Sequence, residues 1–356
     1  MAKGSKGSKA AKAAPSTASK RGAAKKDERS GDKSDERIAS DVSMATQHRI
    51  LNIFRDALEA GDNDTKILQE VKGHLYNRDF AAAFGKPEYL RVYALRWSAG
   101  RALGYLQIFS DIGEHPSSDH VEQSTESSGF KAVCLGGGAG AELVALAGWL
   151  SHRSTIARPS HLQLLDVADW TLVVDALRKG ITIPPTLSKY ASAGARDANV
   201  ELLPPQALHC VFSRCNVLQL ELEELQHIAG NADLITLMFT LNELYSTSVS
   251  KTQRLLTQLT DIAKPGSLLL VVDSPGSYST VIINGTEKKY PMQWLLDHTM
   301  LGTIKGGSTD ACKWHKVVSD DSRWFRLPSG LQYPIELENM RYQIHLYRRQ
   351  SDETPD

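Results

Sequence analysis

The sequence contains few cysteines and no long apolar run. Its four cysteines form no C-x-x-C pair and have no zinc-ligand spacing, which excludes a zinc module and a thioredoxin-type redox site. No stretch is long and apolar enough to span a bilayer, and no apolar signal-peptide core follows Met1. We therefore expect a soluble intracellular protein with reduced thiols, no metal and no membrane contact.

The sequence also lacks a net charge, although its charges are unevenly placed. The 41 basic and 41 acidic side chains balance over 356 residues. Residues 1–26 hold eight basic side chains and no acid, so this segment carries +8 and the remainder sums to −8. This balance excludes a basic surface over the whole protein, as a general nucleic-acid-binding protein would have.

Residues 1–40 are rich in Lys, Ala, Gly and Ser and have almost no large apolar side chain. Such a segment buries too little surface to offset the entropy lost on ordering, so a disordered basic tail is predicted. It is either a solvated tail or a nuclear or nucleolar address that also contacts RNA phosphates, and the two interpretations are compatible. The segment lacks the amphipathic apolar face of a mitochondrial presequence.

The central feature is a glycine-rich stretch over residues 131–142, which reads Lys-Ala-Val-Cys-Leu-Gly-Gly-Gly-Ala-Gly-Ala-Glu. It predicts a short buried strand, a turn at Gly136, Gly138 and Gly140, and a helix that begins near Ala141. Glycines let a ligand approach bare main chain, and the helix start offers free N–H groups. Taken alone, the motif fits a dinucleotide site, an S-adenosylmethionine site or a tight structural turn.

The chain before this stretch is predicted to be helical. Apolar residues recur at helical spacing over residues 41–110, and the run 93–103 carries Arg96 and Arg101 among aromatic residues. These arginines either lie along the core or reach a cofactor carboxylate from a helix packed over the glycine turn. Residues 111–129 are polar and rich in turn formers, which predicts a linker.

After the turn, strands and helices alternate, and polar residues follow the strands. Asp166 stands at the end of the second strand, where an acid accepts hydrogen bonds from both ribose hydroxyls. The alternative role, a helix cap, suits Asp169. Asn216 follows the third strand and either holds the adenine amine through its carbonyl oxygen or forms a turn.

The fourth strand is predicted within residues 233–245, whose continuous apolar run is typical of a strand buried on both faces. Its end should face the substrate, which makes Asn242, Glu243 and Tyr245 the predicted substrate contacts. Glu243 equally suits a cap of the following helix, 249–263.

Aromatic and basic residues gather in the last part of the chain. A fifth strand is predicted to end at Asp273, a helix to cover 292–300, and an edge or antiparallel strand to cover 341–347. The clusters 314–316 and 323–326 combine Trp with Lys, His and Arg. They either stack bases and hold phosphates or belong to the core.

This alternation predicts an α/β fold with a doubly wound parallel sheet. An acid after the second strand, an amide after the third and a polar cluster after the fourth fit S-adenosylmethionine better than NAD. A hydride-transfer enzyme would also need a second domain, and the segment after Ser274 is short for one.

The combination of motifs resembles a known family, the fungal 25S rRNA (uridine-N3) methyltransferases. The similarity covers about residues 45 to 350 and is carried by the segments 96–98, 135–142, 165–170, 239–243 and 322–326. One departure is Ala99, where relatives are expected to have a proline, and it concerns only the local helix geometry.

The resemblance implies a Rossmann-like class I methyltransferase domain over residues 130–350, with an all-helical N-terminal extension and a short tail at 351–356. It implies S-adenosylmethionine as the cofactor, held by Gly136, Gly138, Gly140, Asp166 and Asn216. The implied reaction is methylation of N3 of a uridine in 25S rRNA, on free large-subunit rRNA or on a pre-ribosome. The implied place is the nucleus or nucleolus, with the cytoplasm as an alternative.

N3 of uracil must lose a proton to react, so Glu243 is the predicted base and Asn242 its orienting partner. RNA affinity would come from the basic tail and local patches and would be sensitive to salt. Two other functions stay open: methylation of a protein or small molecule, which suits the acidic body, and a non-catalytic binding module. The oligomeric state is not specified by the sequence.

Overall fold

The computed structural model describes residues 42–113, 129–153, 158–197, 199–283, 286–302 and 312–351. All of them belong to one unit of the chain, Ser40–Asp356. The basic tail, most of the expected linker and most of the short C-terminal tail lie outside the described residues. The domain boundaries drawn from the sequence therefore stay predictions.

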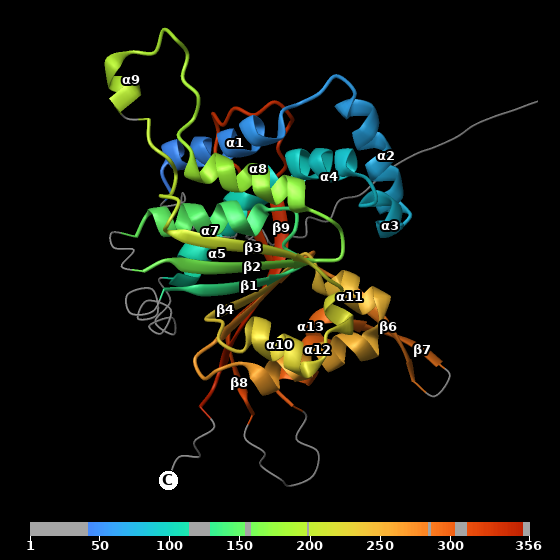
Figure 1. The fold of residues 1–356 in the computed structure, drawn as a ribbon. Helices are drawn as coiled ribbons and strands as arrows, with labels where there is room; N and C mark the ends of the chain where they lie inside the picture. Colours follow the sequence, from blue (N-terminus) through green and yellow to red (C-terminus); the bar gives the residue numbers. More distant parts are fainter. Residues whose placement is uncertain are drawn as a thin grey trace, which may run out of the picture. The chain divides into compact units, whose positions relative to one another are not determined.

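A seven-stranded sheet organises this unit, in the strand order β3-β2-β1-β4-β5-β9-β8. Strands β1 to β5 pair in parallel, whereas β9 is antiparallel to both β5 and β8. This is the expected class I methyltransferase sheet (Figure 1). The strands are β1 (Lys131–Leu135), β2 (Ser160–Asp166), β3 (Leu208–Arg214), β4 (Leu234–Met238), β5 (Leu268–Asp273), β8 (Trp314–Phe325) and β9 (Met340–Arg349).

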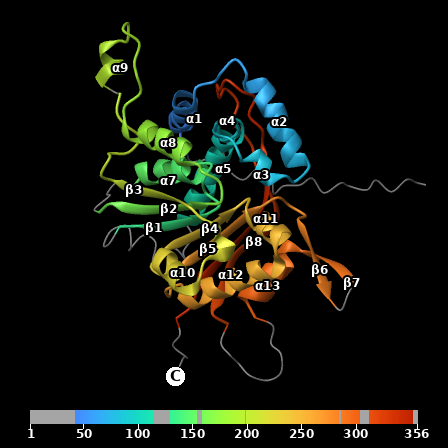
Figure 2. The same cartoon turned by 45° about the vertical axis from the view of Figure 1, so that its right-hand side comes forward.

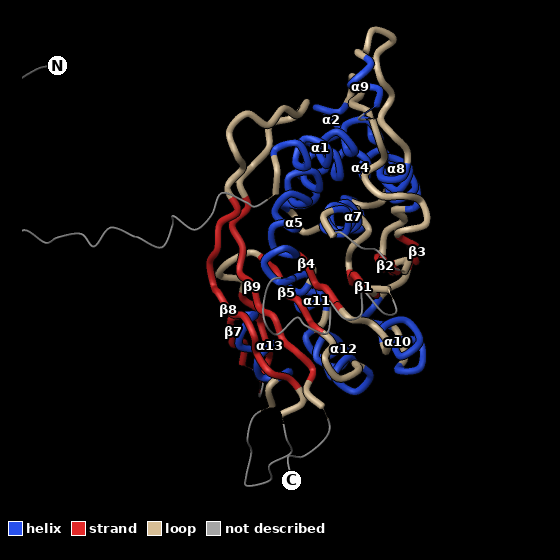
Figure 3. Tube along the Cα trace, turned by 90° about the vertical axis from the view of Figure 1, so that its left-hand side faces the viewer, coloured by secondary structure: helices blue, strands red, loops and turns tan. Residues whose placement is uncertain are grey.

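Helices cover both faces of the sheet. One face carries α7 (Ala141–Ser151), α8 (Thr171–Thr182) and the N-terminal helices, and the other carries α10 (Leu222–Ala229), α12 (Val249–Ile262) and α13 (Met292–Met300) (Figure 3). The N-terminal helices precede β1, as expected. They are α1 (Met44–Leu58), α2 (Asp64–Tyr76), α3 (Phe80–Ala83), α4 (Pro87–Tyr93), the π-helical turn η1 (Ala94–Ser98) and α5 (Ala99–Gly113).

The remaining elements lie in the connections. A hairpin of β6 (Tyr278–Ile283) and β7 (Thr286–Pro291) projects beside α13, and α9 stands away from the sheet (Figure 2). The others are α9 (Ala193–Asp197), the 3₁₀ turn η3 (Val217–Gln219) and α11 (Leu241–Thr247).

Successive side chains of the strands pack into two hydrophobic cores, one on each face of the sheet. On β1, Cys134 joins the core that contains the N-terminal helices, whereas Val133 and Leu135 join the core beneath α12 and α13. Ile50 and Phe54 of α1 are fully buried in the first core. The helical extension is therefore part of the same hydrophobic core as the sheet.

The structure decides two alternatives left open for the last part of the chain. The strand expected over 341–347 is the antiparallel one, because β9 pairs antiparallel with β5 and β8 and lies between them. The two aromatic and basic clusters are opposite ends of β8 and differ in burial. Trp314 is buried and donates from Nε1 to Thr260 Oγ1 at 2.9 Å, whereas Trp324 is 46% exposed.

The four cysteines are all free thiols, as expected. Across the described segments, no helix combines the length and the apolarity needed to cross a bilayer.

The helical extension should contribute to the stability of the whole unit. Phe54→Ala empties a fully buried site in α1 and should lower the free energy of unfolding by about 3–5 kcal/mol. The matched control is Tyr76→Ala in α2, whose side chain is 90% exposed and should cost less than about 0.5 kcal/mol. Urea unfolding followed by circular dichroism measures both, and equal losses would show that the extension does not share the core.

Candidate active site

The strand order reverses between β1 and β4, and the glycine turn lies at this point. In open α/β sheets, ligands bind in the crevice at the carboxyl ends of the strands where the order reverses. Gly136 and Gly140 have φ angles of +83° and +81°, a left-handed conformation that favours glycine. A Cβ on Gly136 would lie 2.3 Å from Thr240 Oγ1, and one on Gly138 would lie 2.0 Å from Trp170 Cδ1. The turn is thus closely packed against the side chains of Thr240 and Trp170.

Asp166 ends β2 next to this turn. Its Oδ2 accepts from the Gly138 N–H at 3.2 Å and its Oδ1 from the Ala168 N–H at 3.1 Å. Burial raises the pKa of Asp166, while these N–H groups oppose the rise by stabilising the ionised form. Each carboxylate oxygen keeps a further lone pair for a hydroxyl.

The neighbouring residues take the roles that the sequence left open. Asp169 accepts from the Thr171 N–H at 3.3 Å and from its hydroxyl at 2.6 Å, so Asp169, not Asp166, serves the start of α8. Val167, directly after Asp166, is 61% exposed, an apolar surface beside the acid that the sequence analysis did not identify.

Asn216 lies at the start of η3, beyond β3. Its Oδ1 accepts from the Leu218 N–H at 3.0 Å, so the turn-forming role is present. The oxygen has a second lone pair, and its role toward adenine stays a prediction.

The fourth strand ends earlier than expected. Phe239 has a φ of +57°, an uncommon backbone conformation for a non-glycine residue, and the chain leaves the strand there. Asn242 and Glu243 consequently lie in the first turn of α11 and not on a strand end. Tyr245 is buried in the core, so its expected substrate contact is wrong.

Glu243 does not cap the next helix, which was the alternative role. The cap of α12 is Ser248, whose Oγ accepts from the Lys251 N–H at 3.3 Å. The side chain of Glu243 therefore remains available to the site.

Asp273, at the end of β5, holds the start of α11. Its Oδ2 accepts from the Asn242 N–H at 2.9 Å, and its Oδ1 accepts from the Ser274 N–H at 2.7 Å. The sequence placed Asp273 at a strand end without a role. A role at the site could have been inferred from the sequence, because an acid at the carboxyl end of a parallel strand lies at the edge where ligands bind.

Arg101, from α5, brings a positive charge to these acids. Its Nη1 donates to Tyr93 Oη at 2.9 Å, and its guanidinium carbon lies 4.6 Å from the centroid of the Phe239 ring. Within the described residues, the ion pairs do not include Arg101. The other candidate arginine, Arg96, is buried and paired with Glu338, which is a structural role.

Burial and mutual repulsion raise the pKa values of the carboxyl groups toward neutral pH. Burial raises the pKa of Glu243 to about 7; Arg101 opposes this rise, and Asp273 and Asp166 add to it. Burial also raises the pKa of Glu142, in the first turn of α7, to about 8, and that of Asp273 to about 6. The site is a cluster of titratable acids that act electrostatically on one another and on Arg101.

These residues fit S-adenosylmethionine. The glycine turn lies where the strand order reverses, Asp166 beside it would hold the ribose hydroxyls, and Arg101 would hold the methionine carboxylate. The buried Oε1 of Glu142 has no hydrogen-bond partner among the described residues.

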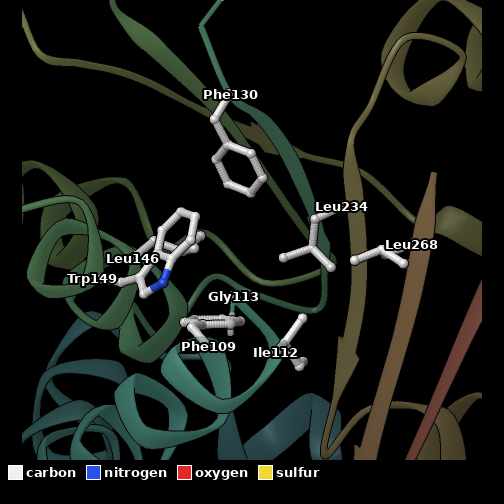
Figure 4. A pocket seen from close by; sticks show the side chains of 8 residues that line it. All are labelled: Phe109, Ile112, Gly113, Phe130, Leu146, Trp149, Leu234 and Leu268. Atoms are coloured by element: carbon white, nitrogen blue, oxygen red, sulfur yellow. The ribbon is translucent and has the colours of Figure 1, made fainter. Parts of the chain in front are cut away.

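An apolar cavity elsewhere is excluded as the cofactor site. It has a volume of about 10 Å³ and lies at the amino ends of β4 and β5, where Leu234 and Leu268 line it with Phe130 and Trp149 (Figure 4). This volume holds about one water molecule and is far below that of a cofactor pocket.

Comparisons with known proteins agree with this geometry. Residues 52–348 match the family described as "Putative SAM-dependent methyltransferase". The chain belongs to this family of S-adenosylmethionine-dependent methyltransferases. It is also 34% identical over 302 residues to the 25S rRNA (uridine(2843)-N(3))-methyltransferase of Saccharomyces cerevisiae, which covers 80% of this chain and 77% of that protein.

Solved structures were compared as well. An O-methyltransferase family protein from Burkholderia thailandensis has 15% identity and a TM-score of 0.40, covering 76% of this chain and 63% of its own, less than two thirds. A SAM-dependent methyltransferase from Methanosarcina mazei has 10% identity and a TM-score of 0.35, covering 65% and 97%. The family assignment therefore rests on the sequence matches.

S-Adenosylmethionine supplies a methyl group on a positively charged sulfur when it is bound. Residues around the glycine turn would bind and orient it. The roles of the individual residues toward the cofactor stay predictions.

Asp166→Ala should weaken the binding of S-adenosylmethionine about 10- to 100-fold, because each hydrogen bond to a charged group contributes roughly 1.5–3 kcal/mol. Isothermal titration calorimetry measures this, with NAD titrated in parallel and no NAD binding expected. The matched control is Asp169→Ala, which removes an exposed acid three residues away and should leave the affinity unchanged. Equal affinities of the wild type and the Asp166→Ala variant would disprove the ribose contact.

Proposed function

We propose that the protein methylates N3 of a uridine in large-subunit rRNA. Two observations support this. The 34% identity to a curated 25S rRNA uridine-N3 methyltransferase extends over most of both chains. The site also places a carboxyl group whose pKa is about 7 in the first turn of α11, beside the cofactor edge of the sheet. The sequence identity is the observation that carries the reaction type.

The reaction requires a base because N3 of uracil carries a proton and is flanked by two carbonyl groups. Glu243, as the carboxylate, accepts this proton and leaves N3 with the electron pair that forms the new bond to carbon. A pKa near the working pH provides enough ionised base without making it too weak to take the proton.

Asn242 is the residue that orients the general base, Glu243. Its backbone N–H is held by Asp273, which fixes the first turn of α11 and the direction of both Asn242 and Glu243. The Asn242 side chain offers an N–H donor, which matches a uracil carbonyl next to N3. Alignment of the two reactants supplies much of the rate.

Aromatic side chains around Arg101 exclude water from the site. Tyr105 is buried and its ring lies 6.5 Å from that of Phe239. Arg101 lowers the pKa of Glu243 against the effect of burial, which keeps a share of this base ionised.

The substrate in the cell is proposed to be the large-subunit rRNA or a pre-ribosome, in the nucleus or nucleolus. The support is the segment of +8 charge over residues 1–26, which suits RNA phosphates and a nuclear address.

The proposed substrate can be tested in cells. Deletion of the gene should remove one N3-methyluridine from large-subunit rRNA, and the wild-type gene should restore it. The Asp166→Ala variant should not restore it, because the cofactor site is lost, while Asp169→Ala should. Mass spectrometry of nuclease-digested 25S rRNA measures the modification. An unchanged N3-methyluridine content in the deletion strain would refute the proposal.

Glu243 should set the pH dependence of methyl transfer. The base acts only when ionised, so kcat/KM should rise about tenfold per pH unit below pH 7 and level off above it. Glu243→Gln should lower kcat roughly 10²- to 10⁴-fold, abolish this inflection and leave the affinity for S-adenosylmethionine unchanged. The matched control is Glu223→Gln, an exposed acid on α10. If the inflection persists in Glu243→Gln, another group is the base.

A further inference from the structure

A cationic and aromatic surface lies at the end of β8, outside the cofactor site. We call it the arginine–tryptophan patch and define it as Trp324, Arg326 and Arg341, all exposed. The guanidinium carbons of Arg326 and Arg341 lie 4.9 and 5.7 Å from the centroid of the Trp324 ring. Arg323 is nearby but is paired with Asp320 at 3.0 Å and is therefore not included.

The patch is held in place by its neighbours. Arg341 Nε donates to Ser322 Oγ at 3.0 Å, which fixes the guanidinium and leaves its other N–H groups free to bind. Phe325, next to Trp324, is buried against Gly104 of α5. Because neighbouring strand residues point to opposite faces, Trp324 is directed away from α5.

The strand register places the patch at the catalytic edge of the sheet. Both β5 and β8 are antiparallel to β9, so the end of β8 lies at the same edge as the end of β5 (Figure 3). Asp273 pairs with Gln343, and Arg341, two residues further along, pairs with Trp324. Strand geometry puts the backbones of Asp273 and Trp324 on the order of 10 Å apart.

A chain of contacts joins the patch to the proposed catalytic residues. Asp273 holds the Asn242 N–H, and the next residue, Ser274, accepts from Gln343 Nε2 at 2.7 Å through its carbonyl oxygen. Gln343 and Arg341 lie on the same face of β9, because they are two residues apart. Asn242 and the arginine–tryptophan patch are therefore connected through the ends of β5 and β9, by way of the buried side chains of Asp273 and Gln343.

The chemistry of the patch matches single-stranded RNA. Guanidinium groups bind phosphates with paired N–H donors, and an exposed indole stacks on a base of any sequence. The chain outside residues 1–26 sums to −8, so a local cationic patch at the catalytic edge is a selective place for a polyanion.

We propose that the arginine–tryptophan patch binds the nucleotides that flank the target uridine, as a single strand. The proposal rests on the proposed function, since it assigns the path of the RNA at that same site. Stacking of a flanking base on Trp324 and phosphate contacts to Arg326 and Arg341 hold the strand while the target base enters the site. The patch determines where the RNA lies, and Asn242 and Glu243 act on the base.

The test measures RNA binding by the full-length protein. The probe is a fluorescein-labelled single-stranded RNA with one central uridine, titrated in the presence of S-adenosylmethionine over a series of salt concentrations. Trp324→Ala should weaken binding about 5- to 150-fold, because stacking contributes roughly 1–3 kcal/mol per base, and Trp324→Phe should restore most of it.

The arginine variants should change the salt dependence. Arg326→Ala/Arg341→Ala should weaken binding and lower the slope of log K against log salt by about 1.4, since each phosphate contact on a single strand contributes about 0.7. Methyl transfer should show a raised KM for RNA with kcat nearly unchanged. The matched control is Arg348→Ala. Arg348 lies near the other end of strand β9, and this variant should bind RNA as tightly as the wild type.

The outcomes separate this proposal from the proposed function. If the patch variants and Arg348→Ala bind RNA as tightly as the wild type while uridine methylation proceeds, the patch proposal is wrong and the function stands. If the variants impair methylation only of intact pre-ribosomal particles and not of the naked RNA, a protein partner occupies the patch and the proposal is also wrong. If the wild type binds S-adenosylmethionine but methylates no uridine, the proposed function fails and the patch proposal fails with it.

Discussion

The electrostatic balance between Arg101 and the carboxyl groups around it determines the properties of the site. Burial alone would keep Glu142, Glu243 and Asp273 protonated, and a protonated Glu243 cannot take a proton. The guanidinium of Arg101 lowers the pKa of all three acids and so retains ionised carboxylate at neutral pH. Replacing the arginine by an apolar side chain would leave buried acids without a counter-charge, which is costly in both stability and reactivity.

The helical extension supplies the positive charge of this balance. Arg101 lies on α5, which precedes the first strand, and α5 and α1 pack into the same core as β1 and α7. The positive charge is therefore held by the hydrophobic core and not by a surface loop. The contacts that pack the extension into the core therefore also hold Arg101 near the acids.

The glycine turn and the loop after β4 form the other half of the site. Thr240 fills the space where a Cβ of Gly136 would lie, and Phe239 adopts its left-handed conformation directly before it. The ring of Phe239 then lies against the guanidinium of Arg101. Phe239 and Thr240, between β4 and α11, thereby connect the glycine turn to the charge on α5.

Residues whose role depends on local geometry were predictable from the sequence. The glycine turn and the acid at the end of β2 could be placed because a strand followed by a polar residue specifies a sheet edge. The local pattern did not predict that β4 ends before Phe239, because no residue propensity indicates a left-handed conformation there. As a result, Asn242 and Glu243 were assigned to a strand end and not to the first turn of a helix.

By itself, the sequence determined the fold class, the family resemblance and the residues around the cofactor turn, because these depend on short segments with strong patterns. The tertiary structure decided that Arg101 and not Arg96 faces the acids, that Asp273 holds α11, and that Trp324 is exposed while Trp314 is core. These outcomes depend on contacts between segments far apart in the chain. Their pairing follows from how the strands and helices pack, and no local pattern encodes it.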